Sequence, residues 1–277
     1  MTLKHQVGQP RHVYLAPAVG RAMQILDLLA DNGGTPVSLT DLARAIDAAK
    51  SSTSNICAVL EDAGMITRTQ HGYSLGRHTA ELGGAWLSQF DQIAEFYRAC
   101  HHSPVLRTEL VQMAVLHGTD ILYLARHDGR SPLRLSAGAN VGDHYPASVT
   151  ALGNALLSTL SPLQVDALYR DTALPQFTAR STQTLEQLHA KLALARERGY
   201  ALDEGEVFPN VAGIAMPVPP RASGDNVFAV NVSRIVPLDP PAIDHDTLVR
   251  LREALKELVD SLTNPMTPRV ENRVSWD

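Results

Sequence analysis

Residues 38–64 read SLTDLARAIDAAKSSTSNICAVLEDAG, and this stretch predicts the fold of the N-terminal part of the chain. Ser38 stands directly before an apolar helical pattern and Asp41 follows it by three residues, which is typical of a capped helix start. Asp47–Ala49 leave only a tight connection before a second helical pattern begins at Lys50. Two helices joined by so short a turn indicate a helix-turn-helix.

The flanking segments extend this motif into a winged form. An amphipathic helix is expected from Ala18 until Asn32 stops it. Downstream, Met65–Arg68 and Tyr73–Leu75 flank a polar turn, which predicts a short hairpin. The expected inward-facing residues of the third helix are Ile56, Val59 and Leu60. In a winged helix-turn-helix the third helix enters the major groove of DNA.

A long linker helix is expected over residues 79–100. It carries an apolar stripe at spacings of four, four, three and four residues: Leu82, Trp86, Phe90, Ile93 and Tyr97. Such a stripe suits packing against another subunit, so we expect a homo-oligomer, either a dimer or a tetramer. The alternative is that the stripe packs on its own domain.

The rest of the chain mixes strands and helices. Strands are expected at Leu110–Leu116, Asp120–Arg126, Leu133–Ser136, Val211–Val218 and Val227–Ile235, and helices at Thr150–Leu160, Pro162–Tyr169, Leu185–Arg198 and Asp244–Leu262. The predicted class is α+β: a flexible arm (1–17), a winged helix-turn-helix (18–78), the linker helix (79–100), a mixed α/β domain with an antiparallel sheet (101–263), which the family resemblance given below implies to be an effector-binding domain, and a flexible tail (264–277).

Composition narrows the possible functions. The chain has 277 residues, which suits two domains, and no run approaches the roughly 18 apolar residues of a membrane helix. Two cysteines cannot form a disulfide framework, and no signal peptide is recognisable, so we expect a cytoplasmic protein. The net charge of −5 excludes coating of nucleic acid by bulk charge. Residues 1–90 carry 7 basic and 7 acidic residues, so the whole excess lies in the second part.

Seven segments together resemble the IclR family of bacterial transcriptional regulators. They are VGRAMQIL (19–26), SLTDLA (38–43), KSS (50–52), LEDAGMI (60–66), TALGNALL (150–157), GYALDE (199–204) and GIAMPV (213–218). The resemblance covers residues 18–262. It implies a ligand-responsive regulator that binds double-stranded operator DNA, with an N-terminal winged helix and a C-terminal effector domain.

Small polar residues crowd the start of the third helix, where hydroxyls and backbone N–H groups suit phosphate oxygens and Asn suits an adenine edge. The candidate DNA-binding residues are Arg21, Arg44, Lys50, Ser51, Ser52, Ser54, Asn55, Arg68, Gln70 and His71. The family often has Arg where Asn55 stands and Pro where Ala49 stands. The base preference of this chain is therefore expected to differ from that of family members with those residues.

The candidate effector site combines a helix start with a strand face. Thr150 is expected to cap a helix and leave the N–H groups of Ala151, Leu152 and Gly153 free for a carboxylate. Asn231 and Ser233 share one face of an otherwise apolar strand. The family's ligand positions match Ala151, Leu152, Asp203, Gly213, Asn231 and Ser233, and Tyr145, Phe208, Met216 and Phe228 are candidate apolar lining.

Two of these positions differ from the family pattern and concern ligand size. Gly213 stands where Cys is common, and Asn231 where Ser is common. The missing side chain at Gly213 leaves room for an effector larger than a two- or three-carbon acid. We therefore expect a small carboxylate, aromatic acids included, or a related amide.

Two other function classes remain open from the sequence. An enzyme would need catalytic residues, but the chain lacks the G-x-S-x-G, H-E-x-x-H, Walker and G-x-G-x-x-G motifs, and we expect no catalytic residue, metal site or cofactor. A module that only holds protein partners would use the stripe of the linker helix. A promoter-fragment shift that a small molecule alters would favour the regulator over both.

Overall fold

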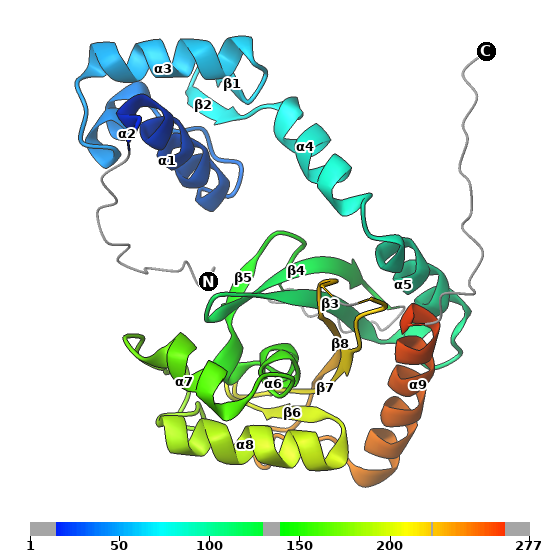
Figure 1. Ribbon diagram of the computed structural model, residues 1–277. Helices are drawn as coiled ribbons and strands as arrows, with labels where there is room; N and C mark the ends of the chain where they lie inside the picture. Colours follow the sequence, from blue (N-terminus) through cyan, green and yellow to red (C-terminus); the bar gives the residue numbers. More distant parts are fainter. Residues whose placement is uncertain (1–14, 130–138, 223, 264–277) are drawn as a thin grey trace, which may run out of the picture. The chain divides into compact units, whose positions relative to one another are not determined.

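The computed structural model describes residues 15–129, 139–222 and 224–263, which form two compact units that divide between Gln89 and Phe90. The N-terminal unit contains helices α1 (Pro17–Asp31), α2 (Leu39–Ala45) and α3 (Lys50–Asp62), strands β1 (Ile66–Thr69) and β2 (Gly72–Leu75), and helix α4 (Arg77–Leu87). Figure 1 shows the three helices and the hairpin in the expected winged order. The winged helix-turn-helix prediction is confirmed.

Local signals explain where these elements begin. The Ser38 hydroxyl accepts the Asp41 N–H at 3.2 Å and donates to the Asp41 carboxylate at 2.6 Å, as its spacing predicts. Pro17 lies in the first turn of α1, where its missing N–H has no cost. The helices bury a shared apolar core of Ile25, Leu29, Leu42, Ile46, Cys57, Leu60, Ile66 and Tyr73.

The expected inward position of Val59 is wrong, since its side chain is 70% exposed. Thr53, Cys57 and Leu60 form the buried face of α3. Val59 lies two positions after Cys57, which places it on nearly the opposite side of the helix. The exposed face of α3 is therefore wider than its sequence indicates.

The expected single helix over residues 79–100 is two helices, α4 and α5 (Asp91–His102). Gly83 and Gly84 weaken α4, and the Ser88 hydroxyl donates to the Ala85 carbonyl near its end. Phe90 is extended before α5 and packs edge-on against Phe228, with ring centroids 5.5 Å apart. This aromatic contact fixes the start of α5 within the C-terminal unit.

The C-terminal unit is built on a six-stranded antiparallel sheet of order β5-β4-β3-β8-β7-β6. The strands are β3 (Leu110–His117), β4 (Asp120–His127), β5 (His144–Pro146), β6 (Ala201–Glu204), β7 (Val211–Val218) and β8 (Phe228–Ile235). The expected strand Leu133–Ser136 lies outside the described residues. β5 and β6 were not expected, because three or four residues are too short for a clear alternating pattern.

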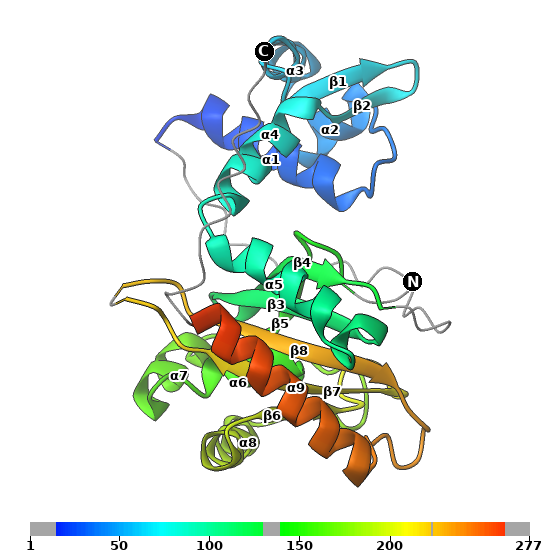
Figure 2. The ribbon, with the colours of Figure 1, turned by 90° about the vertical axis from the view of Figure 1, so that its right-hand side faces the viewer.

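Helices cover both faces of this sheet. On one face lie α6 (Ala151–Leu157) and α8 (Leu185–Arg198), with α7 (Pro162–Tyr169) beside α8, while α5 and α9 (His245–Thr263) cover the other, as Figures 1 and 2 show. The short helices η1 (Leu106–Thr108) and η2 (Ala147–Val149) complete the unit. This arrangement confirms the α+β class.

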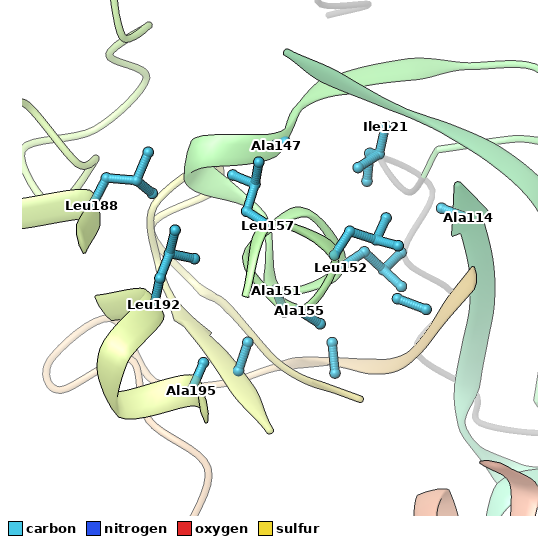
Figure 3. Close-up of a cluster of buried hydrophobic side chains, with 14 of the residues drawn as sticks. Ala114, Ile121, Ala147, Ala151, Leu152, Ala155, Leu157, Leu188, Leu192 and Ala195 are labelled. Atoms are coloured by element: carbon cyan, nitrogen blue, oxygen red, sulfur yellow. The ribbon is translucent and has the colours of Figure 1, made fainter. Parts of the chain in front are cut away.

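Helix α6 is the centre of the core. All seven of its residues are buried. Figure 3 shows the helix, with Ala151, Leu152, Ala155 and Leu157 labelled, between Leu188 and Leu192 of α8 and Ala114 of β3. The run of alanine, glycine and leucine lets the helix approach the sheet closely. A Cβ atom added at Gly153 would overlap the Cα and carbonyl oxygen of Ala147. The position of Gly153 is therefore set by a backbone contact.

Candidate nucleic-acid interface and ligand cavity

The outer face of α3 carries the predicted DNA-binding residues of this helix. Lys50, Ser51, Ser52, Ser54 and Asn55 are all exposed. Thr53, between them in sequence, is buried and its hydroxyl donates to the Ala49 carbonyl at 3.1 Å. The helix therefore presents hydroxyls and one amide on the side away from the core, a chemistry that suits phosphates and base edges.

The hairpin places further polar groups near the end of β1. Thr69 closes its turn by donating to the Gly72 carbonyl at 3.0 Å and accepting the His71 N–H at 3.2 Å. Arg68, Gln70 and His71 are exposed, and the Arg68 guanidinium lies 5.9 Å from the Tyr73 ring centroid. These three predicted wing residues lie close together at the tip of the hairpin, Arg68 on β1 and the other two in the turn.

The two other predicted arginines differ in their environment. Arg44 is exposed but ion-paired with Asp41 at 3.0 Å, so its charge is partly neutralised within α2. Arg21 lies half-buried on α1. Neither lies on α3 or on the hairpin.

The C-terminal unit contains a cavity of about 50 Å³ between α6 and the sheet. Its lining residues are Leu110, Gln112, Tyr123, Ala139, Tyr145, Thr150, Ala151, Asp203, Val207, Phe208, Val211, Gly213, Asn231 and Ser233. The sheet face that meets α6 brings these residues together, because alternate residues of a strand share a face. Asp203 pairs with Gly213, Gly213 with Ser233, and Gln112 with Asn231 across neighbouring strands.

The acidic group of the cavity is Asp203. Burial raises the pKa of its carboxyl to about 7, and the neighbouring charge of Glu206 acts in the same direction. The Glu206 N–H donates to the Asp203 carboxyl at 2.9 Å, which opposes the rise. Among the described lining residues there is no Lys, Arg or His. Near neutral pH the neutral form of Asp203 is therefore well populated.

The amide of Asn231 supplies a second polar group. Its Nδ2 donates to Ser233 Oγ at 2.9 Å, while its buried Oδ1 has no hydrogen-bond partner among the described residues. Beside it, a Cβ at Gly213 would meet Ala151 Cβ at 3.5 Å and Ser233 Oγ at 3.6 Å, which are ordinary contacts. The absent side chain thus leaves free space, as the sequence indicated.

Four of the predicted effector residues lie elsewhere. Met216 and Phe228 lie on the opposite face of the sheet, because each is an odd number of positions from the cavity residues Gly213 and Asn231 on its own strand. Leu152 is fully buried in the core around α6. The Gly153 N–H donates to the Thr150 hydroxyl at 3.1 Å, so the expected free N–H is used by the cap.

Several cavity residues were missed from the sequence. Gln112 is the one polar residue of strand β3 before His117 at its end, and its Nε2 donates to the Ala139 carbonyl at 3.0 Å. That isolated amide was a signal that strand periodicity could have used. Tyr123 and Val207 carried no comparable signal, because apolar and aromatic residues are common in any core.

Two family models match the chain in the order of its two units. Residues 18–70 match the IclR helix-turn-helix domain, and residues 104–263 match the bacterial transcriptional regulator IclR C-terminal domain. The chain belongs to the IclR family. As a member of this family it is a transcriptional regulator with a DNA-binding helix-turn-helix domain and a C-terminal effector-binding domain.

Two curated relatives of this IclR-family protein are also named as transcriptional regulators. The protein is 27% identical over 243 residues to the HTH-type transcriptional regulator XynR of Escherichia coli, covering 87% of this chain and 93% of the relative. It is also 27% identical over 220 residues to the repressor AllR of Salmonella paratyphi A, covering 79% of each.

Solved structures share the fold of the chain. An IclR transcriptional regulator from Alicyclobacillus acidocaldarius aligns with a TM-score of 0.76 at 21% identity, covering 90% of this chain and 98% of that one. An IclR homologue from Microbacterium hydrocarbonoxydans, complexed with 4-hydroxybenzoate, aligns at 0.70 and 22% identity, covering 88% and 98%. No helix in the described part of the chain is both long and apolar enough to span a membrane.

Proposed function

We propose that this regulator binds operator DNA through the exposed face of α3 and the β1–β2 loop, and that a small carboxylate or a related amide bound in the cavity controls it. The DNA surface is supported by the exposed polar residues Lys50, Ser52 and Asn55. The effector site is supported by the cavity that joins Asp203 to Asn231.

The observation that carries the effector class is the environment of Asp203. A neutral carboxyl is a hydrogen-bond donor, whereas an ionised one only accepts and repels anions. Since the described lining residues include no cation, a carboxylate ligand would be held by donors, of which neutral Asp203 is one. The unpartnered Oδ1 of Asn231 favours a ligand that also carries a hydroxyl or N–H donor.

Ligand size is the second part of this proposal. The cavity of about 50 Å³ has space for only a few water-sized groups. This space suits small aliphatic acids, which differs from the larger effector that the missing side chain at Gly213 led us to expect. An aromatic acid would need additional space beside Tyr145 and Phe208. A panel should therefore include short hydroxy acids, their amides and 4-hydroxybenzoate, the ligand of the structural relative.

Binding of a carboxylate is expected to weaken as the pH rises through 7. The ligand is anionic throughout the range, while Asp203, with a pKa of about 7, changes from neutral to charged. If only the neutral form binds, affinity falls about tenfold between pH 6 and pH 8. Calorimetric titration at both pH values measures this change.

The variant Asp203→Asn is the control for the titration. Its amide cannot ionise, so binding of the same acid should lose its pH dependence. A neutral amide ligand should bind wild type with little pH dependence. Carboxylate binding that is equally tight or tighter at pH 8 in wild type would contradict the proposal.

We propose further that the regulator is a homo-oligomer, a dimer or a tetramer, that uses α4. No residue of α4 is buried, and Leu82 on this helix is 51% exposed. Replacement of Leu82 by Glu is expected to lower the mass seen in sedimentation analysis, because a charge would be buried in the contact. Leu163→Glu, at an 80% exposed position on α7, is the matched control. An unchanged mass for Leu82→Glu would remove α4 from the interface.

A further inference from the structure

A partly buried ion pair between Lys191 and Glu206 lies next to the cavity-lining residue Val207. Lys191 Nζ of α8 is 2.6 and 2.7 Å from the two carboxylate oxygens of Glu206, whose side chain is 9% exposed. Thr182 adds its hydroxyl at 2.9 Å and its N–H at 3.3 Å to the same carboxylate. Glu206 is thus held by three donors from α8 and the segment before it.

The backbone of Glu206 is held as firmly as its side chain. Its N–H donates to the Asp203 carboxyl at 2.9 Å, and its carbonyl accepts the Ser181 hydroxyl at 2.7 Å. The next two residues, Val207 and Phe208, line the cavity. Anchoring Glu206 therefore fixes both the acidic group of the cavity and the apolar wall beside it.

Lys191 also reaches the other wall of the cavity. Its Nζ lies 3.4 Å from the carbonyl oxygen of Ser148, two residues before Thr150, which lines the cavity. It donates to the Thr182 hydroxyl at 2.9 Å as well. One ammonium group therefore connects the segment before α6 with the segment after β6.

We infer that Glu206, clamped by Lys191, is a positioning residue for effector binding, which orients the Asp203 carboxyl and holds the Val207–Phe208 wall without touching the ligand. Glu206 and Lys191 do not line the cavity, so their effect passes through Asp203 and the backbone. This inference rests on the proposed effector site.

Electrostatics supports the same role. The charge of Glu206 raises the pKa of Asp203, and that of Lys191 lowers it. The other titratable groups on the cavity walls are the phenols of Tyr123 on β4 and Tyr145 on β5, whose own pKa values are raised by burial. Replacing Glu206 by Gln removes the raising charge and leaves the Lys191 ammonium without its partner. Both effects favour ionised Asp203.

The test uses the full-length variant Glu206→Gln, which keeps the size and one acceptor of the native side chain. Carboxyl-carbon NMR should show Asp203 titrating about one pH unit lower than in wild type. Affinity for a carboxylate that binds wild type should fall about fivefold at pH 7 and less than about twofold at pH 5.5, because the neutral fraction of Asp203 falls from about a half to about a tenth at pH 7 but changes little at pH 5.5. A merely structural role would weaken binding equally at both pH values.

Two more variants complete the test. Lys191→Arg retains an ion pair with Glu206, so its affinity for the same acid should stay within about threefold of the wild-type value. His189→Gln is the matched control, because it removes another side-chain contact of α8, the 2.7 Å hydrogen bond between His189 and Asp166, which lies outside the cavity lining. His189→Gln should change neither the titration of Asp203 nor the affinity.

The outcomes separate the two proposals. If no panel acid binds wild type, the effector proposal fails, and the Asp203 titration alone decides the role of Glu206. If an acid binds wild type, Glu206→Gln with unchanged affinity at pH 7 would overturn the inference. An unchanged Asp203 titration in Glu206→Gln would overturn it in either case.

Discussion

Gly153→Ala is expected to destabilise the C-terminal unit by about 3 kcal/mol or more, at the upper end of the cost of overpacking a core. The new Cβ would overlap the Cα and carbonyl oxygen of Ala147, and backbone cannot rotate away as a side chain can. All residues of α6 are buried, so the helix has no free side toward which it could move. Urea unfolding of the full chain, followed by far-UV circular dichroism, measures the loss.

Gly83→Ala is the matched control for this change. A Cβ at Gly83 meets no atom within 4 Å, and the residue lies inside helix α4. Alanine is the better helix former, so this variant should be as stable as wild type or more stable by up to about 1 kcal/mol. A Gly153→Ala protein within about 0.5 kcal/mol of wild type would show that the contact between α6 and η2 is looser than the structure has it.

Asn55→Ala is expected to weaken binding to a specific operator by about ten- to a hundredfold, the 1–3 kcal/mol of one good amide–base contact. Asn55 is exposed on α3, and no described residue hydrogen-bonds its side chain, so truncation should affect DNA rather than folding. An operator selected from random DNA by the full-length protein, followed by fluorescence anisotropy, gives the affinity. Binding to non-specific DNA should change little.

Two comparisons interpret the Asn55 result. Lys50→Met should weaken binding to all sequences and reduce the salt slope by about one, because a lysine at the start of α3 would contact phosphate. Asn210→Ala, an exposed asparagine of the C-terminal unit, should leave DNA binding unchanged. If Asn55→Ala also left specific binding unchanged, base reading would have to be assigned to other residues of α3 or to the hairpin.

The N-terminal unit could be predicted from sequence because its signals are local. The Ser38 cap, the tight turn before Lys50 and the hairpin each depend on residues a few positions apart. The prediction of one long linker helix failed partly because of a distant contact. The break between α4 and α5 involves Phe90 and Phe228, more than a hundred positions apart.

The cavity that we propose as the effector site was predictable only in part. Strand periodicity placed Asn231 and Ser233 on one face, and the family resemblance added Asp203 and Gly213. The same periodicity excludes Met216 from the cavity lining, but only once it is known which face of β7 meets α6. The packing of α6 on the sheet determines that face.

By itself, then, the sequence determined the winged helix-turn-helix, the polar face of α3 and the longer strands and helices of the C-terminal unit, since caps, turns and periodicity act within a few residues. Only the tertiary structure decided the chemistry of the cavity. It places the half-buried Asp203 beside Glu206 and brings Lys191 from α8 to both walls. The physical reason is that a carboxyl's protonation and position depend on burial and on charges from distant segments, which no local pattern records.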